Sequence, residues 1–212
     1  MHRNKTYVGI MRLHSDVNEK NLNEAISKFI GKINQLPPVR SRVKRALRER
    51  EVVGFKILER EGRDVLFETE VQAGTYIRKL CDDIGKLIGG AHMLELRRTK
   101  AGIFSETDNN FINLYDLDKA IDEYKEGKEE KLRKILIPAE QALKKTMPFI
   151  EIKSSSIKQL LTGKPLMKSD IKPFTKLPNE EIFALSSKDS LIAIMKKSNE
   201  GDIIARPLFV YN

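Results

Sequence analysis

Hydrophobic and polar residues near the start of the chain first follow the period of a strand and then that of a helix. Residues 7–13 alternate between two faces, which predicts a β-strand. The next apolar residues recur at helical spacing over residues 18–30, until Gly31 interrupts the pattern. We therefore expect the chain to begin with a strand followed by an amphipathic helix.

A β-hairpin and a second helix are expected next. Two runs rich in β-branched and aromatic residues, 52–58 and 65–71, flank the turn sequence of residues 61–64. Gly74-Thr75 then opens a helical pattern that Gly89-Gly90 closes. This segment predicts a strand, a turn, a strand and a helix in that order.

The pattern changes again toward the end of the chain. Residues 92–98 alternate once more and complete the expected first core. Residues 116–145 are charged with helical spacing, and Pro148 marks a change to short β-rich runs separated by Gly and Pro. We expect a small, β-rich second domain after residue 145.

The charge balance points to a polyanionic partner. The 212 residues contain 39 Lys and Arg against 30 Asp and Glu, a formal net charge of +9. Such a field favours nucleic acid over an acidic protein or a small acid. A generally basic surface without a specific ligand remains the alternative, so the placement of the charge must decide.

The densest positive charge lies between residues 40 and 50, where Glu49 is the only acid. Its basic residues are Arg40, Arg42, Lys44, Arg45, Arg48 and Arg50. A run of charge is usually a solvated face, and this is one interpretation. The other is a segment that binds a phosphate backbone.

Few residues are suited to metal or disulfide chemistry. Cys81 is the only cysteine and lies on the apolar stripe of the second helix, while His2, His14 and His92 are scattered along the sequence. We therefore expect no intrachain disulfide and no metal site. We also expect no membrane span, because no apolar run approaches about 20 residues. An intracellular protein without a signal peptide is expected.

Arg78 occupies the first turn of the second predicted helix. The positive end of the helix dipole disfavours a cation there by about 0.3–1 kcal/mol, so Arg78 requires an anionic partner. A nearby surface carboxylate would satisfy it without any functional role. Tyr76 and Leu80 are four residues apart and share a face, for which ordinary core packing is the simple interpretation.

Several segments, taken in order, resemble the TruB and dyskerin family of RNA pseudouridine synthases. They are Lys5-Thr6-Tyr7, the double-proline basic segment of residues 37–45, residues 74–80, and residues 91–102. The double-proline segment resembles the dyskerin-like, H/ACA-type branch. The β-rich tail from about Pro148 resembles a PUA domain.

The resemblance implies an isomerisation that needs no cofactor. Uracil leaves C1′ of its ribose, rotates and is rejoined through C5, with help from a carboxylate and a second proton-transfer group. By resemblance, Tyr7 would stack on the flipped base, Arg78 would pair with the catalytic aspartate, Leu80 would wall the pocket, and Tyr76 would support the site. The basic segment would bind the RNA backbone and close over the nucleotide.

The family's aspartate lies in a Gly-Thr-Leu-Asp type motif upstream of the lysine-tyrosine strand, and we expect it to be missing from this sequence. None of the aspartates considered lies in such a motif: Asp64, Asp82, Asp83, Asp108 and Asp116. Asp82 and Asp83 are interpreted as helix-surface charges. A longer reading frame or a separate polypeptide would supply the aspartate, or the chain binds RNA without catalysis.

The sequence thus predicts an α+β fold with two domains. Residues 1–145 would form an incomplete pseudouridine synthase domain with a mixed, mainly antiparallel sheet, and residues 146–212 a PUA-like β-barrel. The expected function is conversion of uridine to pseudouridine in ribosomal or transfer RNA, directed by an H/ACA guide RNA and aided by small accessory proteins. Its compartment would be the cytoplasm of an archaeal-type cell, or the nucleus or nucleolus of a eukaryote.

Two other functions remain open. One is a non-catalytic RNA-binding or scaffold protein derived from this family. The other is a generic basic protein of the ribosome, against which the ordered run of motifs argues.

Overall fold

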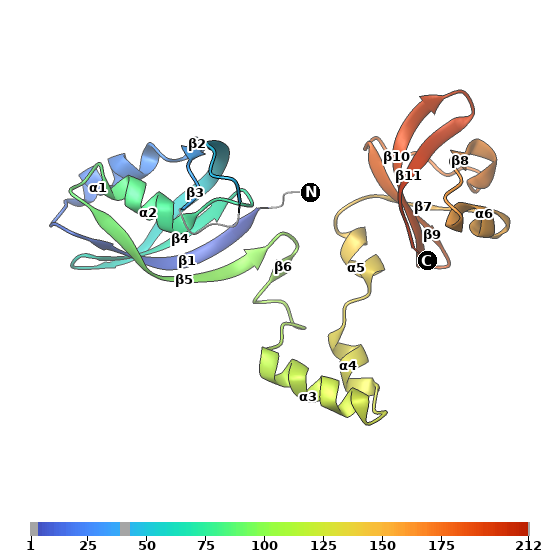
Figure 1. Ribbon diagram of the computed structural model, residues 1–212, viewed down its shortest axis with the longest axis horizontal. Coiled ribbons are helices and arrows are strands. Elements are labelled where there is room, and N and C mark those ends of the chain that lie inside the picture. The colour runs from blue at the N-terminus through green and yellow to red at the C-terminus, as the bar shows by residue number, and fades with distance from the viewer. Residues whose placement is uncertain (1–3, 39–42, 212) are drawn as a thin grey trace. The chain divides into compact units, whose positions relative to one another are not determined.

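The computed structural model describes residues 4–38 and 43–211. The chain divides into two compact units, Met1–Phe111 and Ile112–Asn212, and each has its own sheet (Figure 1). Within the described residues no helix is long and apolar enough to cross a membrane.

The first unit is a six-stranded sheet with the order β2-β3-β4-β1-β5-β6 and two helices. Its strands are β1 (Lys5–Leu13), β2 (Gly31–Gln35), β3 (Arg48–Glu61), β4 (Asp64–Val71), β5 (Ala91–Ala101) and β6 (Phe104–Ser105). Helices α1 (Glu19–Ser27) and α2 (Ile77–Gly85) cover one face of this sheet (Figure 1). Their apolar stripes and the facing strand residues, among them Met11, Phe67 and Leu80, form one buried core.

The hairpin and the second helix lie where the hydrophobic pattern predicts them. Strands β3 and β4 pair from Val52 opposite Val71 to Glu61 opposite Asp64, and Gly62 occupies the left-handed region in the turn between them. The first helix is shorter than residues 18–30. Asn18 caps it by accepting the N–H of Asn21 at 2.8 Å, and it ends at Ser27.

The second unit contains three helices followed by a five-stranded sheet. The helices are α3 (Leu114–Lys125), α4 (Glu130–Ile135) and α5 (Ala139–Lys144). The sheet has the order β7-β9-β10-β11-β8, from β7 (Phe149–Glu151), β8 (Leu166–Met167), β9 (Ile182–Ser187), β10 (Ser190–Glu200) and β11 (Ile203–Val210). Helix α6 (Ile157–Leu161) lies between two short 3-10 turns, η1 (Ser154–Ser156) and η2 (Lys168–Asp170), the first directly before it and the second after β8.

The predicted α+β class is confirmed, with two corrections to the sheets. Every pairing described in the first sheet is antiparallel, so the expected mixed sheet is wrong there, and the one parallel pair of described strands is β7 with β9. The second sheet is a curled half-barrel instead of a closed barrel, because its two end strands, β7 and β8, do not pair with each other among the described residues.

The domain boundary expected between residues 145 and 146 stays a prediction. The boundary of the compact units lies earlier, after Phe111. Helix α5 contacts the second sheet, since the carboxylate of Glu140 accepts the backbone N–H of Leu191 at 3.1 Å. This hydrogen bond also lowers the pKa of Glu140.

Candidate active site at the start of helix α2

The segment between β4 and α2 turns sharply before the helix begins. Gly74 has a φ of +88°, a backbone conformation that is strained for any residue with a side chain. Thr75 does not cap the helix as the sequence suggests, because its hydroxyl donates to the carbonyl of Gln72 at 2.8 Å. Tyr76 is the N-cap residue instead and uses no side-chain hydrogen bond for capping. The helix therefore starts two residues later than Gly74-Thr75 implies.

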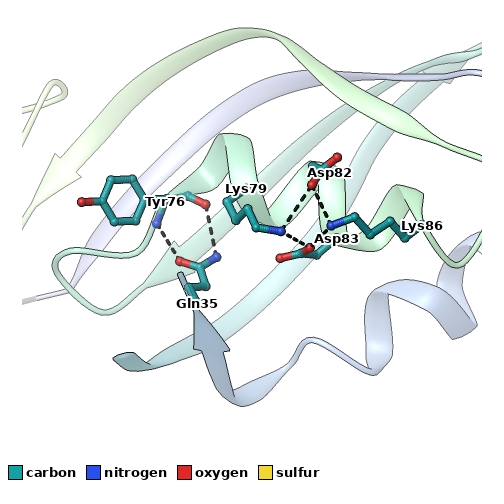
Figure 2. A network of polar contacts seen from close by, with 6 residues as sticks. All are labelled: Gln35, Tyr76, Lys79, Asp82, Asp83 and Lys86. Carbon is teal, nitrogen blue, oxygen red and sulfur yellow. Dashed lines mark hydrogen bonds and ion pairs between the residues drawn. The ribbon is translucent and has the colours of Figure 1, made fainter. Parts of the chain in front are cut away.

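Gln35, at the end of β2, provides the side-chain hydrogen bonds that the residues at the start of α2 do not provide themselves. Its Oε1 accepts the backbone N–H of Tyr76 at 2.9 Å, and its Nε2 donates to the carbonyl of Tyr76 at 3.3 Å (Figure 2). The same carbonyl accepts the first helical N–H, that of Leu80, at 3.0 Å. Gln35 is only 2% exposed, so both bonds lie away from water. Gln35 was not predicted as a site residue, because only the fold brings it next to Tyr76.

Arg50 lies on the other side of the same turn. A Cβ atom on Gly74 would lie 3.2 Å from its Nε, so the absence of a side chain at Gly74 lets the guanidinium approach the backbone. The Nη1 of Arg50 donates to the carbonyl of Glu49 at 2.8 Å. Its Nε is buried without a hydrogen-bond partner among the described residues. Arg50 therefore packs against the turn at Gly74.

The four predicted pocket residues all lie in the first unit, but their environments differ. Tyr7 lies in β1, opposite Thr69, and packs half-buried against the core that contains Leu80. Leu80 is 0% exposed, as expected of a core residue, and its role as a pocket wall stays a prediction. Tyr76 is half-buried, and its ring points away from Gln35 in Figure 2.

Arg78 is exposed in the first turn of α2. No hydrogen bond or ion pair to its guanidinium is found within residues 4–38 and 43–211. The alternative that Arg78 reaches a surface carboxylate is therefore not supported within this part of the chain. Its pairing with a catalytic aspartate stays a prediction.

The carboxylates of Asp82 and Asp83 on α2 form ion pairs with lysines. Lys86 contacts Asp82 at 3.0 Å and Asp83 at 2.7 Å, and Lys79 contacts both as well (Figure 2). Hydrogen bonds from Lys86 and then Lys79 hold the pKa of Asp82 below its usual value. Both aspartates are thus helix-surface charges, as the sequence indicates.

The remaining aspartates that were considered also have partners. Asp64 forms a two-pronged ion pair with Arg12 at 2.6 and 2.7 Å, and this hydrogen bonding lowers the pKa of Asp64. Asp108 accepts the backbone N–H of Ser105 at 2.8 Å. Asp116 lies in the first turn of α3, where its charge stabilises the helix.

The predicted RNA-binding residues are described only in part. Arg40 and Arg42 lie outside the described residues. Lys44 and Arg45 are exposed, and Arg48 begins β3, where it pairs with Gln35 of β2. The basic segment therefore joins the two strands that contact the start of α2.

The cysteine and two of the histidines, all weighed for thiol or metal chemistry, lie within the described residues. Cys81 is 0% exposed, and burial raises the pKa of its thiol to about 12, which identifies it as a packing residue. His14 and His92 are not scattered in space, because their ring nitrogens lie 2.8 Å apart. In the described part of the chain no three His, Cys, Asp or Glu residues gather as metal ligands.

The chain is similar in sequence to members of one family of known proteins. A family model described as the tRNA pseudouridylate synthase B C-terminal domain matches residues 78–144. The chain is 48% identical over 161 residues to the probable tRNA pseudouridine synthase B of Methanopyrus kandleri, covering 75% of this chain and 47% of that protein. It is 42% identical to the protein of the same name from Saccharolobus solfataricus, covering 89% of this chain and 76% of that protein.

Solved structures agree over nearly the whole chain. A Cbf5-Nop10-Gar1 complex contains a chain of 38% identity with a TM-score of 0.78, matched over 99% of this chain and 66% of the other. An H/ACA RNP bound to a substrate RNA containing 2′-deoxyuridine contains one of 35% identity and a TM-score of 0.79. The chain spans about half to three quarters of the curated relatives that it matches. It belongs to the TruB/Cbf5 family of pseudouridine synthases and is a homologue of the archaeal H/ACA-type members.

Proposed function

We propose that the protein converts uridine to pseudouridine in ribosomal or transfer RNA under the direction of an H/ACA guide RNA, with a catalytic aspartate that is not among its 212 residues. The observation that carries this proposal is that Arg78 is exposed and has no anionic partner among the described residues. It is a cation at the positive end of α2. Asp82 and Asp83 on the same helix are engaged by lysines, and Asp64 is engaged by Arg12. A carboxylate brought to this guanidinium would be held by parallel N–H groups.

The chemistry assigns distinct tasks to the residues of this chain. In the reaction the N1–C1′ bond breaks, the C5–C1′ bond forms, C5 loses a proton and N1 gains one, so no oxidant or cofactor is consumed. Tyr7 would stack on the base and aid the proton step, and Arg78 would orient the aspartate. Tyr76 would support the site, and Leu80 would form a wall of the pocket.

The partners follow from the same proposal. The similar solved structures contain Nop10, Gar1 and substrate RNA, and we propose small accessory proteins of this kind and a guide RNA as partners here. The second unit would hold the single-stranded 3′ end of the RNA in the manner of a PUA domain. The archaeal relatives favour the cytoplasm of an archaeal-type cell as the compartment.

A non-catalytic RNA-binding protein is the second candidate. The observation that favours it is that no aspartate of the sequence lies in a motif of the Gly-Thr-Leu-Asp type. Such a protein would keep the basic segment and the second unit, but would not modify the RNA to which it binds.

A conversion assay separates the two candidates. The 212-residue chain is mixed with a guided substrate RNA, with and without the aspartate-bearing segment of a relative, fused or supplied in trans. We expect no pseudouridine from the chain alone and conversion when the segment is present, measured by base-modification mapping. Robust conversion by the chain alone would overturn the proposed site, and RNA binding without conversion in every mixture would favour the non-catalytic candidate.

A further inference from the structure

We propose that Gln35 is a positioning residue for pseudouridine formation, because its side-chain amide fixes the start of α2 and with it Tyr76 and Arg78. This inference rests on the proposed function and names a residue that the family motifs quoted above do not include. Gln35 is 41 residues away from Tyr76 in the sequence and touches no reacting group in the proposal.

The start of α2 needs a partner from outside the helix. The first N–H groups of a helix have no acceptor within it, and Tyr76 offers no side-chain cap. No acidic residue lies in the first turn, while Arg78 and Lys79 bring two cations to the positive end of the dipole. Local sequence therefore favours fraying at the turn that carries the predicted site.

The amide of Gln35 is matched to both backbone groups of Tyr76. It accepts from the N–H and donates to the carbonyl, as a neighbouring strand would. An amide carries an acceptor and a donor side by side at any pH, whereas an ionised carboxylate of the same length only accepts. Because Gln35 is 2% exposed, water cannot readily replace either bond when one is removed.

The strand that carries this amide is paired up to Gln35 itself. Gln35 ends β2, which pairs with β3 along five positions, from Gly31 opposite Val52 to Gln35 opposite Arg48. From β3, Arg50 packs against Gly74 at the preceding turn. Two paired strands thus hold the segment before α2 from outside, one by hydrogen bonds and one by packing.

Removal of these two hydrogen bonds has a direct consequence for catalysis. Tyr76 is the residue that Gln35 holds, and Arg78 lies two positions further in the first turn of the helix. Misplacement of a reacting or orienting group by about 1 Å can cost on the order of a hundredfold in rate. RNA affinity depends mainly on phosphate contacts made elsewhere, so it should change little.

The test compares three variants in the protein reconstituted with an aspartate-bearing segment, and in the 212-residue chain itself. Gln35→Met keeps the length of the side chain and removes both hydrogen bonds. Gln35→Glu keeps an acceptor for the N–H of Tyr76, and at this buried position its carboxyl can donate to the carbonyl of Tyr76 only when it is protonated. Val65→Ala is the control, because it creates a cavity in the same core at a strand position that pairs with Met11 of β1 and Arg60 of β3 and makes no hydrogen bond to Tyr76.

We expect the single-turnover rate of Gln35→Met to fall by about tenfold to a hundredfold, with RNA affinity within about twofold. Gln35→Glu should retain more of the rate. In the chain alone, amide hydrogen exchange at Tyr76 should become faster in Gln35→Met. Val65→Ala should lower the unfolding temperature, and leave the rate and the exchange at Tyr76 unchanged below that temperature.

Two outcomes overturn the positioning role. One is unchanged exchange at Tyr76 in Gln35→Met, and the other is an equal loss of rate in Gln35→Met and Val65→Ala, which would indicate a general loss of stability. Failure of the unsubstituted, reconstituted protein to convert uridine would instead overturn the proposed function. The exchange measurement needs no activity, so the two failures are distinguished.

Discussion

Arg78 carries its charge where the dipole of α2 is also positive. The side chain is exposed, so solvent screens part of this unfavourable interaction. An arginine in such a place gains most from a planar anion that accepts two parallel N–H bonds. A carboxylate meets that requirement, which is why the identity of the cation should matter as well as its charge.

Replacing Arg78 by Lys tests this requirement. In the reconstituted protein we expect the single-turnover modification rate to fall by about a hundredfold, because an ammonium on a flexible stem fixes a carboxylate poorly. Equilibrium RNA binding should remain near that of the unsubstituted protein, since the charge is kept. Equal rates, or a loss confined to binding, would remove Arg78 from the active site.

The roles of single residues were predictable only where local sequence determines them. The position of Arg78 in a first helical turn followed from the apolar spacing of the helix and is confirmed. The helix-surface character of Asp82 and Asp83 likewise followed from their place on it. Gln35 could not be found in this way, because its partner is distant in sequence and an isolated glutamine carries no signal of burial.

At the scale of elements, α2 and β5 approach each other very closely at one glycine. Gly85 is the last residue of α2, and a Cβ atom there would lie 2.2 Å from the backbone nitrogen of Ala91. Neither backbone can move without disturbing the core on both sides. The close approach of helix and strand therefore depends on the absence of a side chain.

Gly85→Ala should lower the free energy of unfolding of the first unit by about 1–3 kcal/mol, because the added methyl overpacks the contact. Alanine is a better helix former than glycine by about 1 kcal/mol. Without a clash, the substitution would therefore stabilise the protein instead. Gly54→Ala is the matched control, since nothing lies within 4 Å of its added Cβ. Its effect should remain within about 0.5 kcal/mol in denaturant titrations. Equal effects of the two substitutions would contradict the close packing.

Elements with a clear period were predicted, and short elements with mixed residues were not. Strands β1, β3, β4 and β5 and helix α2 follow from alternation or helical spacing. Strand β2 was not predicted, because Ile33 is the one apolar residue among its inward positions, Gly31, Ile33 and Gln35. Its stability comes from pairing with β3. Helix α6 was not predicted either, because it is only five residues long and packs on the second core.

For the whole molecule, the net charge of +9 says that RNA will be attracted but not where it binds. Much of the positive charge is neutralised locally. Lys125, Lys128 and Lys131, for example, all form ion pairs with acidic neighbours at 2.8 or 2.9 Å. Lys44 and Arg45 have no ion pair to another described residue and are exposed. Unpaired charge releases counterions most effectively when it meets phosphate.

Substitution of Arg42, Lys44 and Arg45 by Ala should therefore flatten the plot of log RNA affinity against log salt concentration. Each side chain that contacts a phosphate contributes about one unit to the slope, so the full change is about three units if all three do so. The control replaces three lysines of the paired set, Lys125, Lys128 and Lys131, by Ala. It removes the same formal charge, and its slope should stay near that of the unsubstituted chain because those ammoniums already have carboxylate partners. If the two triple variants change the slope equally, RNA responds only to net charge and the basic segment is a solvated face.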